Sequence, residues 1–113
     1  MYYLLNTAMM PQPGNYELIE IDRETFAEEV SMAAVSGDLK HYIGYASTLT
    51  LVEQLTGLDL GGTNREQLTA LAHGDQLLII KLNFRPTSEQ KQLDDPNIED
   101  FRFFNAIYRT RED

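Results

Sequence analysis

The feature that most constrains the fold is an almost unbroken apolar run at residues 76–83, where five of eight residues are Leu or Ile. A strand with one solvated face alternates between apolar and polar residues, whereas a strand buried on both faces does not. The run therefore predicts a central strand, with neighbouring strands on either side and other parts of the chain packed on both faces. That arrangement favours an α/β domain.

Shorter patterns predict the elements around this strand. Further strands are expected at residues 2–5, 16–21, 40–43, 65–71 and 101–108; the first two are close enough for a hairpin, and the last is also compatible with a helix. Asp22 and Ser47 are good N-caps, and Gly37 and Gly57 are good C-terminal stops, so each pair is expected to bound a helix. Together these patterns predict a compact α/β domain, with a mixed sheet of about five strands flanked by helices.

Composition and charge limit the classes of function. The chain has 113 residues, no cysteine, nine Lys or Arg and 18 Asp or Glu, which gives a net charge of −9. This length predicts a single domain over residues 1–113, and the lack of cysteine excludes disulfides, zinc–cysteine sites, iron–sulfur clusters and thiol catalysis. Because no basic leader and no apolar run of ~18 residues is present, we expect a cytoplasmic protein, in the host cell cytoplasm if it is viral. The acidic balance argues against binding to duplex DNA or membrane.

The middle of the chain is the best place for an anionic ligand, because residues 40–91 carry five cations and five anions. At the start of the second predicted helix, Gly44, Ser47 and Thr48 could offer backbone N–H groups and the positive helix end to a phosphate. Alternatively, Ser47 and Thr48 simply cap the helix. Arg65 and Arg85 lie at the ends of predicted strands, where they either converge on this helix start or extend into solvent.

The two histidines, His41 and His73, have no carboxylates at a metal-ligand spacing. We therefore expect no metal site, and no motif indicates a cofactor. Residues 73–75 (HGD) are typical of a turn.

Five short motifs follow one another in a fixed order. They are residues 4–8 (LLNTA), 43–48 (IGYAST), 64–65 (NR), 74–76 (GDQ) and 81–86 (KLNFRP). In this order and spacing the chain resembles the viral ring nuclease family, the type III anti-CRISPR proteins, which have many phage and bacterial relatives. The resemblance spans nearly the whole chain.

The resemblance implies a homodimer that counters type III CRISPR signalling. Members of the family bind cyclic tetra-adenylate, a cyclic oligoadenylate second messenger, in a pocket across the dimer interface. They cleave it without metal: a ribose 2′-hydroxyl attacks the adjacent phosphorus, and a histidine protonates the departing 5′-oxygen. A two-fold symmetric protein suits a ring of repeating units.

Transferred residue by residue, the resemblance assigns ligand binding to Asn6, Thr7, Gly44, Ser47, Thr48, Arg65 and Arg85. The family histidine is replaced by Tyr45, and a phenol is a much weaker acid than imidazolium. The family glutamate falls at Ser88, or at Glu89 after a one-residue insertion. His41, four residues before Tyr45, would share its face if the segment were a strand and would then be a substitute acid; otherwise it is a surface histidine.

Three hypotheses remain open from the sequence. The first is a ring nuclease with altered catalytic groups. The second is a binder that sequesters the cyclic nucleotide without cleaving it. The third is a protein–protein inhibitor on the same fold that uses its acidic surface. The presence of Gly44, Arg65 and Arg85 favours nucleotide binding over the third hypothesis.

Overall fold

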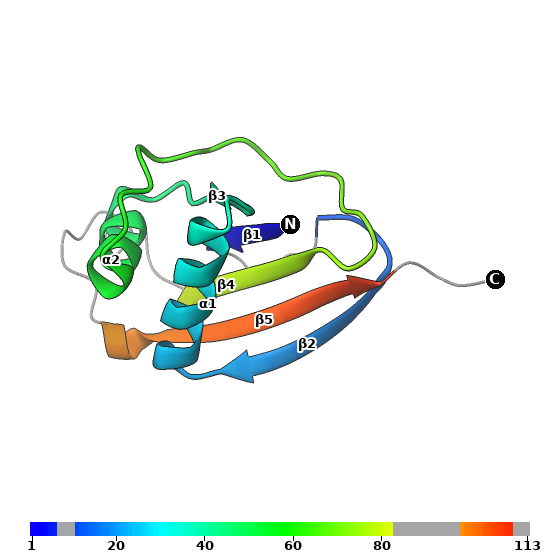
Figure 1. Ribbon diagram of the computed structural model, residues 1–113, viewed down its shortest axis with the longest axis horizontal. Coiled ribbons are helices and arrows are strands. Elements are labelled where there is room, and N and C mark those ends of the chain that lie inside the picture. The colour runs from blue at the N-terminus through cyan, green and yellow to red at the C-terminus, as the bar shows by residue number, and fades with distance from the viewer. Residues whose placement is uncertain (7–10, 83–97, 110–113) are drawn as a thin grey trace.

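The structure is a computed structural model that describes residues 1–6, 11–82 and 98–109. The elements follow in the order β1 (Tyr2–Leu5), β2 (Asn15–Ile21), α1 (Arg23–Val35), β3 (Leu39–Tyr42), α2 (Ala46–Thr56), β4 (Gln76–Leu82), η1 (Ile98–Asp100) and β5 (Phe101–Arg109). The predicted α/β class, with a mixed five-stranded sheet and two helices, is confirmed (Figure 1). The strand alternative for residues 101–108 is the correct one.

β4 occupies the centre of the sheet, whose strand order is β2-β5-β4-β1-β3. β1 pairs in parallel with both β3 and β4, whereas β5 is antiparallel to β4 and β2. The four consecutive residues Leu77–Ile80 are all 0% exposed, so the prediction of a strand covered on both faces is confirmed.

The predicted hairpin between β1 and β2 is wrong, because β4 and β5 lie between these two strands. The short apolar β1 buries Leu4 and Leu5 on opposite faces, so it is stable only in the interior of the sheet. β2 is mostly exposed and forms an edge. Its carboxylates align it with β5, since Glu20 pairs with Arg102 at 2.6 Å and Glu17 pairs with Arg109 at 3.1 Å.

Both helices pack on one face of the sheet, which we call the helix face (Figure 1). In α1 the Thr25 N–H donates to the Asp22 carboxylate at 2.7 Å. Hydrogen bonds from the Thr25 side chain and then from its backbone lower the pKa of Asp22. Phe26 and Val30 point into the core, and the Phe26 and Phe103 ring centroids are 4.8 Å apart. In the described part of the chain, neither helix is long and apolar enough to cross a membrane.

The C-terminal ends of both helices lie where glycine was expected to stop them. Gly37 and Gly57 have φ values of 74° and 73°, in the left-handed region that glycine adopts at little cost. The Gly57 N–H donates to the Glu53 carbonyl at 2.8 Å, which closes the last turn of α2.

The other face of the sheet, which we call the opposite face, packs against the segment between α2 and β4. Leu68 is buried there with Leu77 and Ile79. The predicted strand at residues 65–71 is wrong, because this segment satisfies its backbone with side chains instead of a ladder: the Leu71 N–H, for example, donates to Gln12 Oε1 at 3.1 Å. The predicted turn at residues 73–75 is confirmed, with Gly74 at a φ of 88°.

Burial in β4 predicts a large difference between two leucine-to-alanine substitutions. Leu78→Ala removes a side chain that is 0% exposed and should lower the free energy of unfolding by about 3 kcal/mol. Leu18→Ala in the edge strand β2, where the side chain is 51% exposed, should cost less than about 1 kcal/mol. Urea denaturation of both variants measures the difference, and equal losses would contradict the placement of the core.

Candidate functional site

The carboxyl ends of three parallel strands meet at one edge of the sheet, beside α2 (Figure 1). Leu5, the last residue of β1, pairs with Tyr42 of β3 and with Ile79 of β4. Asn6 follows β1 directly and Gly44 lies just beyond β3, so the two residues come to the same edge. In open α/β sheets, ligands bind outside the carboxyl ends of the strands.

The start of α2 lies at this edge. Its N-cap is Tyr45, in extended conformation, and not Ser47 as expected; Ser47 lies inside the first turn. The helix starts earlier because the Tyr45 carbonyl already accepts from the Leu49 N–H at 3.0 Å. The Tyr45 side chain makes no cap hydrogen bond. The first N–H groups of α2 and the positive end of the helix dipole therefore face this edge of the sheet without an acceptor from Tyr45.

Ser47 and Thr48 therefore do not act as the helix cap in the way that the sequence suggested. Ser47 is half-buried, and Thr48 is only 5% exposed and packs into the domain. Tyr45 is 44% exposed, so its phenol is accessible at the start of the helix. Of these three side chains, Tyr45 is the most available to a ligand.

Arg65 is held against the strand end by a close backbone approach. The Asn64 N–H donates to the Ile43 carbonyl at 2.9 Å, and the Arg65 Nε–H donates to the Gly44 carbonyl at 3.3 Å. A Cβ atom at position 44 would lie 3.4 Å from Arg65 Cγ, which is van der Waals contact, so the arginine side chain packs closely against Gly44. The expected convergence of Arg65 with the start of α2 is therefore present in the geometry.

Asn64 is a positioning residue that the sequence reasoning did not single out. Its Nδ2 donates to the His41 carbonyl at 3.0 Å, and its Oδ1 accepts from the Glu66 N–H at 2.9 Å. These bonds fix the segment that carries Arg65 alongside β3. The sequence feature that could have indicated this role is Asn64 directly before Arg65, since a short amide side chain commonly hydrogen-bonds to nearby backbone groups.

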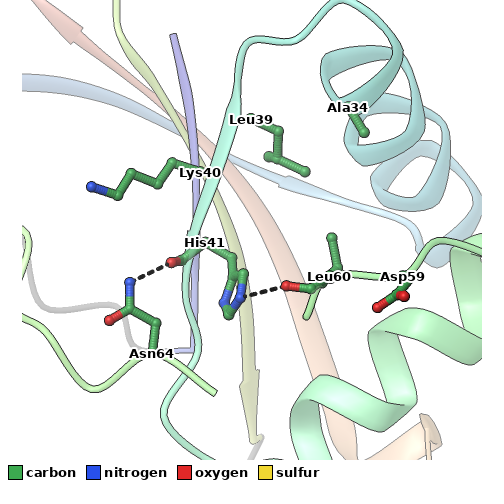
Figure 2. A pocket seen from close by; sticks show the side chains of 7 residues that line it. All are labelled: Ala34, Leu39, Lys40, His41, Asp59, Leu60 and Asn64. Carbon is green, nitrogen blue, oxygen red and sulfur yellow. Dashed lines mark hydrogen bonds between the residues drawn. The ribbon is translucent and has the colours of Figure 1, made fainter. Parts of the chain in front are cut away.

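His41 lies in a pocket of about 390 Å³ between β3, α1 and the segment after α2 (Figure 2). Its Nε2 lies 3.0 Å from the Leu60 carbonyl, and its Nδ1 accepts from the Ile43 N–H at 3.2 Å, so Nε2 carries the donated hydrogen. His41 and Tyr45 do not share a strand face, because β3 ends at Tyr42 and Tyr45 is the N-cap of α2. Both ring nitrogens thus hold backbone in place.

Three cations lie on the opposite face of the sheet. Lys81 is directly paired with Arg102, and Lys40 lies 5.3 Å from the ring centroid of Tyr42. A hydrogen bond with the Tyr42 side chain raises the pKa of Lys40, and burial raises the pKa of the nearby Tyr3, so the lysine stays charged and the phenol neutral. The sequence reasoning missed this group, although the alternation of strand side chains puts Lys81 and Arg102 on one face.

Several expected site residues cannot be placed. Thr7, Arg85 and Glu89 lie outside the described residues. Within the described ranges, no group of three or more His, Cys, Asp or Glu is arranged to hold a metal ion.

Comparison with known proteins agrees with the fold described above. A solved structure, B116 of Sulfolobus turreted icosahedral virus (STIV), superposes with a TM-score of 0.75 and 24% sequence identity, covering 95% of this chain and 98% of that chain. No curated protein matches the chain. The model of the family described as STIV B116-like matches residues 2–105. Since that match covers most of the sequence, the chain belongs to the STIV B116-like family.

Proposed function

We propose that the protein binds a cyclic oligoadenylate, cyclic tetra-adenylate by its resemblance to ring nucleases, and so counters type III CRISPR signalling. The observation that carries this proposal is that the Arg65 Nε–H donates to the Gly44 carbonyl beside the start of α2, where the N-cap residue Tyr45 makes no side-chain cap hydrogen bond. A guanidinium and a set of backbone N–H groups at one strand edge are suited to a phosphodiester. Asn6, from the first motif of the resemblance, comes to the same edge.

A homodimer follows from the size of the ligand. Cyclic tetra-adenylate has four phosphates arranged with rotational symmetry, whereas the described part of one chain places one arginine, Arg65, beside the start of α2. Two chains related by a two-fold axis would present this set twice, facing alternate phosphates of the ring. The half-buried aromatic side chains Tyr3, Tyr42 and Phe104 on the opposite face add surface suited to contacts between proteins.

The proposal is of tight binding with slow or absent cleavage. Departure of the 5′-oxygen needs a proton, and general acid catalysis typically supplies 10²–10⁴-fold in rate. Tyr45 is exposed at the start of α2, beside the proposed phosphate site, but a phenol transfers its proton poorly at neutral pH. His41 is engaged through both ring nitrogens with backbone, so we assign it to positioning the loop at Leu60 and not to proton donation.

Removing the arginine should weaken ligand binding. A charge-assisted hydrogen bond is worth roughly 1.5–3 kcal/mol, so Arg65→Ala should weaken binding of cyclic tetra-adenylate at least about tenfold. Arg23→Ala is the matched control, because Arg23 is an exposed arginine on the far side of the sheet, after the edge strand β2. Titration calorimetry measures both affinities, and a stoichiometry of one ring per two chains is expected. Unchanged affinity in Arg65→Ala, or one ring per chain, would argue against the site or the dimer respectively.

Restoring an imidazole should restore cleavage. Tyr45→His should raise the single-turnover rate on cyclic tetra-adenylate by at least about an order of magnitude, since an imidazolium is the stronger proton donor at neutral pH. Tyr45→Phe separates the roles of ring and hydroxyl: it should keep binding within about threefold if the ring stacks on adenine. Rapid cleavage by the unaltered protein that disappears in Tyr45→Phe would instead identify the phenol as the acid.

A further inference from the structure

His41 joins the end of β3 to the loop that follows α2. Its ring bonds to backbone at two places: Nδ1 accepts from the Ile43 N–H at 3.2 Å, and Nε2 donates to the Leu60 carbonyl at 3.0 Å. Its own carbonyl accepts from Asn64 Nδ2 at 3.0 Å (Figure 2). One residue therefore fastens both ends of the loop at residues 60–64 to β3.

Only one protonation state of the ring makes both of these bonds. Nδ1 accepts and Nε2 donates only in the neutral ring that carries its hydrogen on Nε2. A protonated His41 carries a hydrogen on each nitrogen, so Nδ1 would point a donor at the Ile43 N–H. Ile43 is 0% exposed, so water does not replace the lost acceptor. Because a buried N–H without an acceptor is costly, protonation displaces the ring or the end of β3.

The pocket beside His41 gives a protonated ring a second position. It has a volume of about 390 Å³, and Asp59 lines it next to Leu60 (Figure 2). The Asp59 Oδ1 atom accepts from the Gly61 N–H at 3.0 Å, which holds the carboxylate at the pocket. An imidazolium that turns into the pocket can form a charge-assisted hydrogen bond with this carboxylate.

The charges around the pocket are mostly negative. Asp59 lines it, and Glu53 of α2 lies beside the same loop, since its Oε2 accepts from the Leu60 N–H at 2.8 Å. The last turn of α1, which also borders the pocket, has no basic residue to offset the negative end of the helix. The neighbouring cation, Lys40, points to the other side of β3, where its Nζ lies 5.3 Å from the Tyr42 ring centroid.

The bonds of His41 lie directly beside the candidate site. The Ile43 carbonyl accepts from the Asn64 N–H at 2.9 Å, and the next carbonyl, that of Gly44, accepts from the Arg65 Nε–H at 3.3 Å. The N-cap of α2 follows at the next residue. A shift of Ile43 therefore moves the strand end, the arginine bonded to it and the start of the helix together.

We propose that His41 is a pH-sensitive switch on the phosphate site formed by Gly44, Arg65 and the start of α2. Neutral His41 holds Ile43 in place and so keeps Arg65 in the geometry that binds phosphate. Protonation breaks the bond to the Ile43 N–H, turns the ring towards Asp59 and loosens this edge of the sheet. The effect on the ligand rests on the function proposed above, whereas the change at the end of β3 does not.

NMR spectroscopy tests the switch without a ligand, between about pH 7.5 and 5.5, where histidine changes charge. Long-range ¹H–¹⁵N spectra of the His41 ring should show the hydrogen on Nε2 alone at the higher pH. Protection of the Ile43 N–H against exchange, corrected for the intrinsic rate, should fall about fivefold as the ring is protonated. The Leu78 N–H of β4 is the internal control and should keep its protection. Unchanged protection of the Ile43 N–H would overturn the proposal.

Binding of cyclic tetra-adenylate tests the consequence for the site. The unaltered protein should bind about fivefold more weakly at the lower pH, although Arg65 keeps its charge throughout. His41→Asn does not titrate but offers an amide oxygen to the Ile43 N–H, so its affinity should differ less than about twofold between the two pH values. His41→Leu offers no acceptor and should bind about fivefold more weakly than the unaltered protein at the higher pH, and equally at both.

The variants separate the switch from other causes of pH dependence. His73→Gln removes the second histidine, in the turn before β4, and should leave the pH response unchanged. A response that persists in His41→Asn, or full affinity of His41→Leu at the higher pH, would overturn the switch; circular dichroism checks that each variant folds. If the unaltered protein binds no ligand at either pH, the proposed function fails, and exchange of the Ile43 N–H still decides the switch.

Discussion

β1 hydrogen-bonds in parallel to β3 on one side and to β4 on the other, and the position of the candidate site follows from this double pairing. A parallel partner on each side brings three carboxyl ends to one edge and requires the chain to cross over between them. α1 makes the crossover from the β1–β2 region to β3, and α2 then starts where β3 ends. The start of α2, Asn6 and Gly44 are therefore neighbours because of the strand order, although they are far apart in the sequence.

Local features of the sequence were sufficient to locate most elements. Asp22, Gly37 and Gly57 mark helix ends because capping and left-handed backbone depend only on residues within one turn. The run in β4 predicted a central strand because burial on both faces removes alternation, whatever the neighbours are. The cap of α2 was displaced by two residues, since the Tyr45 carbonyl can accept the first helical bond without any help from its side chain.

Features that depend on distant partners could not be predicted in the same way. Nothing local distinguishes a β1 paired with β2 from a β1 separated from β2 by two other strands. The position of β1 depends on burial of Leu4 and Leu5 and on the pairing of Glu20 with Arg102, 82 residues along the chain. The segment at residues 65–71 has the composition of a strand but does not pair with the sheet. Its leucines instead pack on the opposite face of the sheet. For the site, the order of the motifs indicated Gly44 and Arg65. The hydrogen bond between them could not be predicted, because only the folded chain brings the two residues together.

The chain's negative charge is not uniform, so an acidic composition is compatible with the proposed phosphate ligand. Arg65 lies at the carboxyl edge and Lys40, Lys81 and Arg102 are on the opposite face, whereas the carboxylates of residues 22–38 follow α1. Exposed charges are screened over about 8 Å at physiological ionic strength, which is shorter than the width of a five-stranded sheet. A phosphate at the carboxyl edge therefore responds to Arg65 and the start of α2 more than to the net charge of −9.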